Sequence, residues 1–332
     1  MSSRLSITVA EAQLAPAWKQ AGKPWLAGLL FLSLTFSLSG CGFLISDSPF
    51  RSIGGPIQAK VPGVPFYPQE ELQCGPAALA MALTWSGITV KPKEISSQVY
   101  MPGLEGSLQS AMLGSARRHG RVAYPVAGAE TLLTEIAAGH PVIVLVNLGF
   151  SWFPRWHYAV VLGYDREEDE VLMHSGQIAE EKLNSRTFMN LWRRSDYWGV
   201  LVLAPDQLPA TVEQEQWLKA VAGLESAGEY EAAAVGYAAA LERWDRNFAA
   251  WMGLGNSRYR LQDLDGAVAA FRRAAQLDPE NGMAFNNLAH VLAELGHRED
   301  ALAAARRAMA RGGPLRAAFQ QTFEEIKAMP GP

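Results

Sequence analysis

The chain has 332 residues, of which 49% are hydrophobic and 19% are charged, and its formal net charge at pH 7 is −4. This composition is that of a globular protein and excludes a mainly disordered chain. The slight acidity excludes the strongly basic surface that nucleic-acid binding needs. The length favours two domains over one. Two cysteines allow at most one disulfide and exclude a zinc site made of cysteines alone.

The N-terminal region carries an export signal. Three basic residues precede an apolar segment, Trp25–Leu38, and small residues follow it. The segment ends in Leu38-Ser39-Gly40-Cys41, which resembles the bacterial lipoprotein signal. The resemblance implies that residues 1–40 are removed as a signal peptide and that Cys41 is lipidated. It also implies anchoring in the outer membrane, facing the periplasm, because Gly42 and not aspartate follows. A retained membrane-spanning helix is the alternative.

Residues 41–61 are rich in Ser, Gly and Pro and are predicted to be a tether. Residues 62–205 form the next predicted domain. Its expected helices are Pro76–Trp85, Ser107–His119, Ala129–Ala138 and Ser185–Trp192, and its expected strands are Val142–Val146, Tyr158–Leu162, Val171–Met173 and Gly199–Leu203. Helices come first and strands mostly later, which predicts an α+β domain with an antiparallel sheet.

Residues 214–329 contain an internal repeat of 34 residues. Two of the repeated columns are Trp217, Trp251 and Phe285, and Ala233, Ala267 and Ala301. This period and pattern resemble the tetratricopeptide repeat and predict an all-α array of stacked helix pairs. We expect about three repeats, beginning near Gln214, Phe248 and Gly282, and then a capping helix over Leu315–Met329.

Cys74 has the local setting of a nucleophile. Pro76 is favoured at the first position of a helix, so Cys74 is predicted at a helix N-terminus. The partial positive charge there stabilises a thiolate, and Gly75 permits close approach of another chain. The alternative is a buried structural cysteine. An unpaired thiol is a liability in an oxidising compartment, which counts against that alternative.

A cysteine nucleophile needs a histidine base that is close in space but not in sequence. Of the six histidines, His157 begins an apolar run that reads as a central strand, which would aim the imidazole rigidly. A core histidine satisfied by neighbours is the alternative. The other histidines are placed at a helix end, before a proline, in the repeats, or, for His174, at the end of the strand that follows.

Gln69 with Cys74–Ala78, and then His157–Asp165, resemble the papain-like cysteine peptidases that process bacteriocins at a double glycine. The resemblance implies a papain-like fold over 62–205, with Cys74 as nucleophile, His157 as base and Gln69 as oxyanion donor. Gln73 is the rival for the last role. The family's aspartate at the end of the next strand is absent, and His174 stands at or near its place. We therefore expect His174 to orient His157, with two weaker candidates, Asn147 and Asp165.

These residues predict a lipid-anchored periplasmic cysteine peptidase, a hydrolase with no cofactor or metal, whose repeats recruit a protein substrate or partner. The membrane is contacted through the lipid on Cys41, and no nucleic acid is bound. Two alternatives stay open: an inactive peptide-binding scaffold of an envelope complex, and a Cys-His amidase or transglutaminase acting on cell-wall peptides. Four aromatic residues near the base line a peptide groove or pack in the core: Trp152, Phe153, Trp156 and Tyr158.

Overall fold

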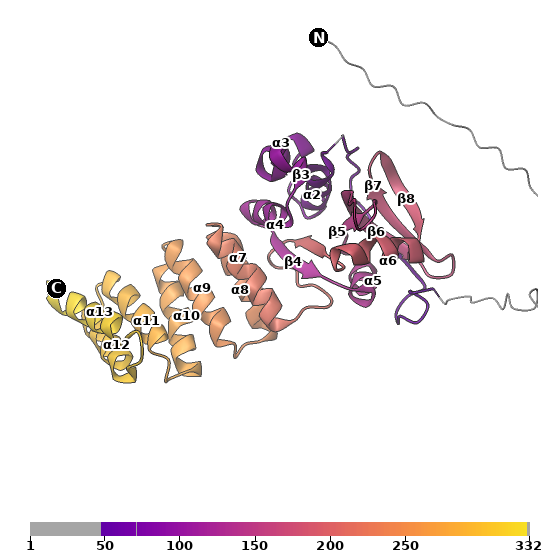
Figure 1. Cartoon of the computed structure of the whole chain (residues 1–332). Helices are drawn as coiled ribbons and strands as arrows, with labels where there is room; N and C mark the ends of the chain where they lie inside the picture. The colour runs from indigo at the N-terminus through magenta and orange to yellow at the C-terminus, as the bar shows by residue number, and fades with distance from the viewer. Residues whose placement is uncertain (1–47, 71, 331–332) are drawn as a thin grey trace, which may run out of the picture. The chain divides into compact units, whose positions relative to one another are not determined.

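The computed structural model of the chain describes residues 48–70 and 72–330 (Figure 1). The predicted signal peptide, Cys41 and the first part of the predicted tether lie outside these residues. The chain from Ser48 onward clusters as one unit. None of the helices in the described ranges is long and apolar enough to cross a membrane.

A seven-stranded sheet forms the centre of the first domain, with the order β4-β9-β5-β6-β7-β8 and with β1 paired to β6. Its strands are β1 (Gln58–Lys60), β4 (Val122–Val126), β5 (Val142–Asn147), β6 (Trp156–Asp165), β7 (Glu170–Ser175), β8 (Ile178–Asn184) and β9 (Gly199–Leu203). Every neighbouring pair is antiparallel. The predicted α+β domain with an antiparallel sheet is confirmed.

Helices cover both faces of this sheet. One face packs against α2 (Cys74–Trp85), α3 (Pro92–Val99) and α4 (Gln109–Arg118), and the other against α5 (Ala129–Ala137) and α6 (Ser185–Trp192). Strand β5 shows why. Ile143 and Leu145 join the cluster around α2, while the alternating valines of the same strand join the opposite cluster. Side chains alternate between faces along a strand, so a strand buried on both faces reads as a continuous apolar run.

Part of the predicted tether is folded instead. Phe50 is fully buried in the core, and Gln58–Lys60 forms β1 beside β6. Its Ser, Gly and Pro content reflects turns between packed residues. The short hairpin of β2 (Tyr100–Met101) and β3 (Gly106–Ser107), joined by the 3₁₀ turn Pro102–Leu104, was not predicted from the sequence. Neither were α3, the edge strand β8, whose residues are mostly polar, or β4.

The repeats form three helix pairs and a final helix, shown in order along the chain in Figure 1. They are α7 (Gln214–Ser226), α8 (Tyr230–Arg243), α9 (Phe248–Arg260), α10 (Leu264–Leu277), α11 (Gly282–Glu294), α12 (Arg298–Arg311) and α13 (Arg316–Ala328). The first helices of the three pairs begin at Gln214, Phe248 and Gly282, where the period places them. The predicted helical array is confirmed.

The two halves share one hydrophobic core. The cluster on the α5 side of the sheet continues through Trp217 and Val221 of α7 to Leu254 of α9. Tyr124 of β4 packs 6.4 Å, between ring centroids, from Trp217. The buried carboxylate of Glu135 accepts backbone hydrogen bonds from Ala210 (3.2 Å) and Thr211 (2.7 Å) in the connection to the repeats. The first repeat is therefore joined to the sheet domain by packing as well as by the chain.

Candidate active site

Cys74 is the first residue of α2, which begins two residues before the predicted Pro76, and its side chain is partly buried. The backbone amides of Tyr158, Gly75 and Cys74 itself lie near the sulfur and favour its ionised form. A Cβ at Gly75 would overlap the side chain of Ser107, so this glycine lets β3 lie directly against the start of the helix. Any larger residue at position 75 would push α2 and β3 apart beside the thiol.

Gln69 and Cys74 converge on the same residue of β6. The Gln69 side chain is buried, and its Nε2 donates to the Tyr158 carbonyl oxygen at 3.2 Å, while its Oε1 accepts from Gly176 N at 3.1 Å. The Cys74 sulfur lies near the backbone N–H of Tyr158, the residue that follows His157. An amide nitrogen carries two hydrogens, so one Nε2 hydrogen of Gln69 is left for an oxyanion. The rival Gln73 accepts from Ser96 Oγ at 2.8 Å and faces α3 instead.

His157 is the second residue of β6 and is partly buried. Its Nε2 lies 3.2 Å from Ser175 Oγ at the end of β7. In the tautomer that donates from Nε2 to Ser175, the Nδ1 lone pair is free to act as a base. Ser175 therefore occupies the orienting position. The β6–β7 pairing sets Val160 opposite His174, so Ser175 lies on the same side of the sheet as Ala159 and His157.

His174 does not contact His157 through a hydrogen bond in this arrangement. Its Nε2 lies 3.3 Å from the Val64 carbonyl oxygen, and its Nδ1 accepts from Glu180 N at 3.1 Å. Successive residues of a strand point to opposite sides, so the neighbour Ser175 and not His174 faces His157. The hydrogen bond to His157 that we expected from His174 is made by Ser175 instead. His174 instead holds the segment before α2 against β7 and β8.

The two weaker candidates for the orienting role are also occupied elsewhere. Asn147 Oδ1 accepts from Gly149 N and Arg155 N, both at 2.9 Å, at the base of the β5–β6 turn. Asp165 Oδ1 accepts from the amides of Glu167 and Glu168 in the acidic turn after β6, where the sequence placed it. Both side chains shape turns.

Burial sets the protonation of the pair. It raises the pKa of the Cys74 thiol above its ordinary value, and the three backbone amides only partly oppose this. It lowers the pKa of His157. Near neutral pH the free protein therefore holds Cys74 as a thiol and His157 as a neutral imidazole, and not the preformed thiolate that the helix N-terminus alone suggested. The thiolate forms when His157 takes the proton.

The four aromatic residues near the base divide between core and surface. Tyr158 is buried against α2, and its hydroxyl donates to the Ser107 carbonyl oxygen at 3.1 Å. Trp152, Phe153 and Trp156 are exposed.

Ser175 is the site residue that sequence reasoning missed, because a serine at the end of a strand carries no signal until the partner of His157 is known. The described residues contain no cluster of three or more metal-ligating side chains.

Two family models match the chain. Residues 61–200 match the Peptidase_C39 like family, and residues 218–282 match the tetratricopeptide repeat. The chain thus contains a C39-like domain followed by tetratricopeptide repeats, the two units that the sequence indicated. No curated protein matches the chain.

Solved structures resemble each half separately. A protein from Bacillus anthracis described as a C39-like peptidase is 18% identical, with a TM-score of 0.37, over 44% of this chain and 97% of its own. The TPR2B domain of yeast Sti1, solved with an Hsp70 peptide, is 14% identical, with a TM-score of 0.33, over 34% and 95%. The Yersinia enterocolitica chaperone SycD, solved with a peptide of the translocator YopD, is 20% identical, with a TM-score of 0.33, over 34% and 91%.

Proposed function

We propose that the sheet domain is a cysteine peptidase in which Cys74 is the nucleophile, His157 the general base and Gln69 an oxyanion donor. The observation that carries this proposal is the convergence on one residue of β6, Tyr158. Gln69 binds the carbonyl of Tyr158, Cys74 meets its amide, and His157 precedes it. The three residues come from two segments, 69–74 and β6, and all adjoin Tyr158; they carry the three functions that acyl transfer needs.

The reaction follows from these positions. His157 takes the proton of the Cys74 thiol as the sulfur attacks the substrate carbonyl carbon, and the oxyanion is bound by Gln69 and a backbone amide. The C–N bond then breaks, and His157 returns the proton to the leaving amine. Water, deprotonated by His157, cleaves the thioester and restores the thiol. Ser175 holds the imidazole in the required tautomer, but as a neutral group it stabilises the imidazolium less than a carboxylate would.

Cleavage of a mixed peptide library tests the activity. The full chain, and the Cys74→Ala and His157→Ala variants, are incubated with tryptic peptides from a bacterial proteome, and new amino termini are read by mass spectrometry. We expect new termini with the wild-type chain and none with either variant. A library left intact by the wild type, or cut equally by Cys74→Ala, contradicts the proposal.

The inactive peptide-binding module is the second candidate function. Two observations favour it: the pKa of the Cys74 thiol is raised, and the partner of His157 is a neutral serine and not a carboxylate. Such a module would hold library peptides without cutting them, so binding that survives Cys74→Ala, with no new termini, selects it. An amidase or transglutaminase on cell-wall peptides would instead act on stem peptides and leave the proteome library intact.

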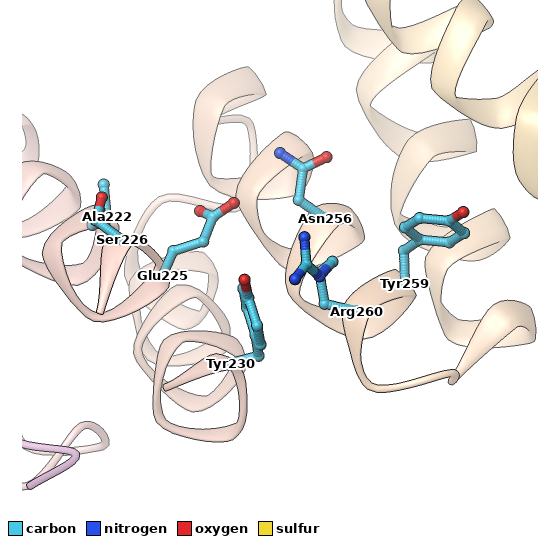
Figure 2. Close-up of a pocket in the computed structure, with 7 residues that line it drawn as sticks. All are labelled: Ala222, Glu225, Ser226, Tyr230, Asn256, Tyr259 and Arg260. Carbon is cyan, nitrogen blue, oxygen red and sulfur yellow. Dashed lines mark hydrogen bonds between the residues drawn. The ribbon is translucent and has the colours of Figure 1, made fainter. Parts of the chain in front are cut away.

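We also propose that the repeats bind a protein segment. A cavity of about 480 Å³ opens between α7, α8 and α9. Figure 2 shows Glu225, Tyr230, Asn256 and Arg260 around this space. The Arg260 guanidinium lies 4.7 Å from the centroid of the Tyr230 ring, and Asn256 Oδ1 accepts from Asn287. Free amide and guanidinium donors beside an aromatic ring suit a peptide that presents carboxylate and apolar groups.

We propose further that Cys41 is lipidated and anchors the chain in the outer membrane, where the protein faces the periplasm. The lipoprotein signal at residues 38–41 supports this. Labelling with a clickable palmitate analogue should be lost in Cys41→Ser and retained in Cys74→Ser. Equal labelling of Cys41→Ser would contradict the anchor and leave the catalytic proposal intact.

A further inference from the structure

The β5–β6 turn holds apolar side chains in solvent next to the base. We call residues 148–156 the aromatic hairpin. Leu148, Phe150, Trp152, Phe153 and Trp156 are each at least half exposed, and Trp152 reaches 80%. The rings of Phe150 and Trp152 are stacked, with centroids 5.4 Å apart. Water contact of this extent is unfavourable for large apolar side chains, so such a patch marks a binding surface.

The backbone of the aromatic hairpin is braced. Phe150 and Phe153 exchange two backbone hydrogen bonds of 3.1 Å, and Asn147 accepts from the amides at both ends of the turn. Arg194 Nη1 donates to the Asn147 carbonyl oxygen at 3.2 Å and also to that of Gly149. A Cβ at Gly149 would overlap the Phe153 carbonyl oxygen, so the turn closes tightly. The exposed rings are thus held in place before any ligand arrives.

A second apolar surface lies beside the nucleophile. We call Leu72, Met101, Leu104 and Leu108 the leucine wall; all four are exposed. Leu72 is two residues before Cys74, and Leu108 follows Ser107, which lies against Gly75. Nine of the eleven large apolar side chains exposed in Ser48–Pro205 belong to the hairpin or to the wall. The apolar exposure is therefore concentrated beside Cys74 and His157, and not spread over the domain.

The charges near these surfaces favour a polypeptide over a lipid surface. Glu70 and Glu105 are exposed next to the leucine wall, while Arg155 is exposed in the aromatic hairpin. Carboxylates at the wall oppose adhesion to anionic lipid. An extended peptide tolerates both signs, because its own side chains can place opposite charges at the two surfaces.

We propose that the aromatic hairpin and the leucine wall bind bulky apolar side chains of an extended polypeptide, close to the bond that Cys74 attacks. This inference rests on the proposed function and names its substrate class: segments rich in Phe, Leu or similar residues around the scissile bond. Leu72 of the wall is two residues from Cys74 and Trp156 of the hairpin adjoins His157, so each surface begins at a catalytic residue. The rings of the hairpin supply specificity that Cys74, His157 and Gln69 do not supply.

Two matched electrophilic peptides test the proposal on the full chain. Both carry a vinyl sulfone at the position of the scissile bond and have the same length and charge; one has Phe and Leu beside the vinyl sulfone and the other has Asn and Ser. Iodoacetamide, which is too small to reach the two surfaces while bound to the thiol, reports Cys74 reactivity alone. The variant is Trp152→Ser with Phe153→Ser. The control is Ile57→Ser, which removes another exposed apolar residue outside both surfaces.

We expect the apolar peptide to label Cys74 about 10-fold faster or more than the polar peptide, a discrimination typical of apolar pockets. The double variant should lose most of this ratio, Ile57→Ser should keep it, and iodoacetamide should react equally with all three proteins. An equal rate for both peptides in the wild type, or an unchanged ratio in the double variant, overturns the proposal.

Two other outcomes identify a different explanation. If the double variant keeps the ratio but, in a Cys41→Ser background without the lipid, sediments less than Ile57→Ser does with phosphatidylethanolamine–phosphatidylglycerol vesicles, the hairpin binds a bilayer and the proposal is overturned. If iodoacetamide reacts slowly with Cys74 and equally slowly in His157→Ala, the proposed function itself fails, and the substrate class falls with it. The peptide ratio and the iodoacetamide rate thus separate the two failures.

Discussion

The two halves of the chain differ in what they bury. The sheet domain, with the segment before it, buries eight polar or charged residues: Ser48, Gln69, Ser115, Glu135, His140, Asn147, His174 and Ser185. The repeats bury two, Ser257 and Thr322, among alanines and large apolar residues. Buried polar groups need partners at defined positions, whereas alanine and aromatic residues need only volume and shape. Substitutions in the first half should therefore change chemistry, and substitutions in the second should change packing.

Removing the Gln69 side chain should have the largest chemical effect of these substitutions. One oxyanion donor is typically worth about 10²–10³ in rate, so Gln69→Ala should lower kcat by about that factor. The matched control is Gln73→Ala, because Gln73 faces Ser96 and not the thiol. Hydrolysis of a peptide found in the library experiment measures both. Similar losses in the two variants would mean that both glutamines act only through the shape of the turn.

The repeat array should be destabilised most by adding side-chain volume where two helices are already in close contact. A Cβ at Gly253 of α9 would overlap the buried ring of Tyr237 of α8, so Gly253→Ala should destabilise the chain by about 1–3 kcal/mol. The control, Gly114→Ala in α4, meets only the flexible end of Arg118. Helix propensity should stabilise that variant by up to about 1 kcal/mol. Urea denaturation gives both values, and a loss at Gly114 equal to that at Gly253 would refute the contrast.

The junction between the halves should respond to loss of one carboxylate. Glu135 accepts hydrogen bonds from His140 and from Thr211 and Ala210, and although burial opposes its ionisation, these bonds hold its pKa below the ordinary value. In Glu135→Gln the new NH₂ group faces N–H groups that also donate, which leaves buried donors unpaired. The free energy of unfolding should fall by about 1–3 kcal/mol. We expect a lower urea midpoint at pH 7, with the exposed Glu130→Gln as the control.

The sign with pH follows from the same shift. A carboxyl whose folded pKa is lowered stabilises the fold above its unfolded value, near 4.5, and loses this contribution as the pH falls through the folded pKa. The difference between wild type and Glu135→Gln should therefore shrink below about pH 4. A difference that stays constant from pH 7 to pH 3 would mean that the charge of Glu135 does not hold the junction.

The smallest effect is expected at Ser175. The free energy of one neutral hydrogen bond corresponds to a factor of about 2 to 10 in rate, so Ser175→Ala should slow hydrolysis by that factor. Burial lowers the pKa of His157, so the wild-type rate should fall with acid only below pH 6.5. Ser175→Asp places a carboxylate at Nε2 and should move this acid limb upward. If His174→Gln moves the limb and Ser175→Asp does not, the orienting role returns to His174.

The repeats were predictable because their determinants are local and periodic. A column of residues 34 apart fixes each helix pair, and the observed helices begin at the predicted residues. In the sheet domain the apolar runs of β5 and β9 were clear, but β8 is polar and exposed, and β1 pairs with a strand about a hundred residues away. Neither carries a local signal.

The candidate site shows the same limit. Cys74, His157 and Gln69 stand in recognisable segments, so sequence could name them. The partner of His157 depends on whether residue 174 or 175 shares its side of the sheet, which the pairing of β6 with β7 decides. Burial of the thiol, which reverses the direction of its pKa shift from the one expected at a helix N-terminus, arises from segments distant in the chain.

The rate of Cys74 alkylation by iodoacetamide tests the central claim most directly, because it needs no substrate. Mass spectrometry of the Cys74 peptide separates it from Cys41 in the full chain. At pH 7 the wild type should react about 10²-fold faster than His157→Ala, since a positioned base contributes at least that factor. The wild-type rate should fall only below pH 6.5, where His157 becomes protonated. Equal rates for the two proteins at every pH would show that Cys74 is a buried structural thiol and that the site is not a catalytic pair.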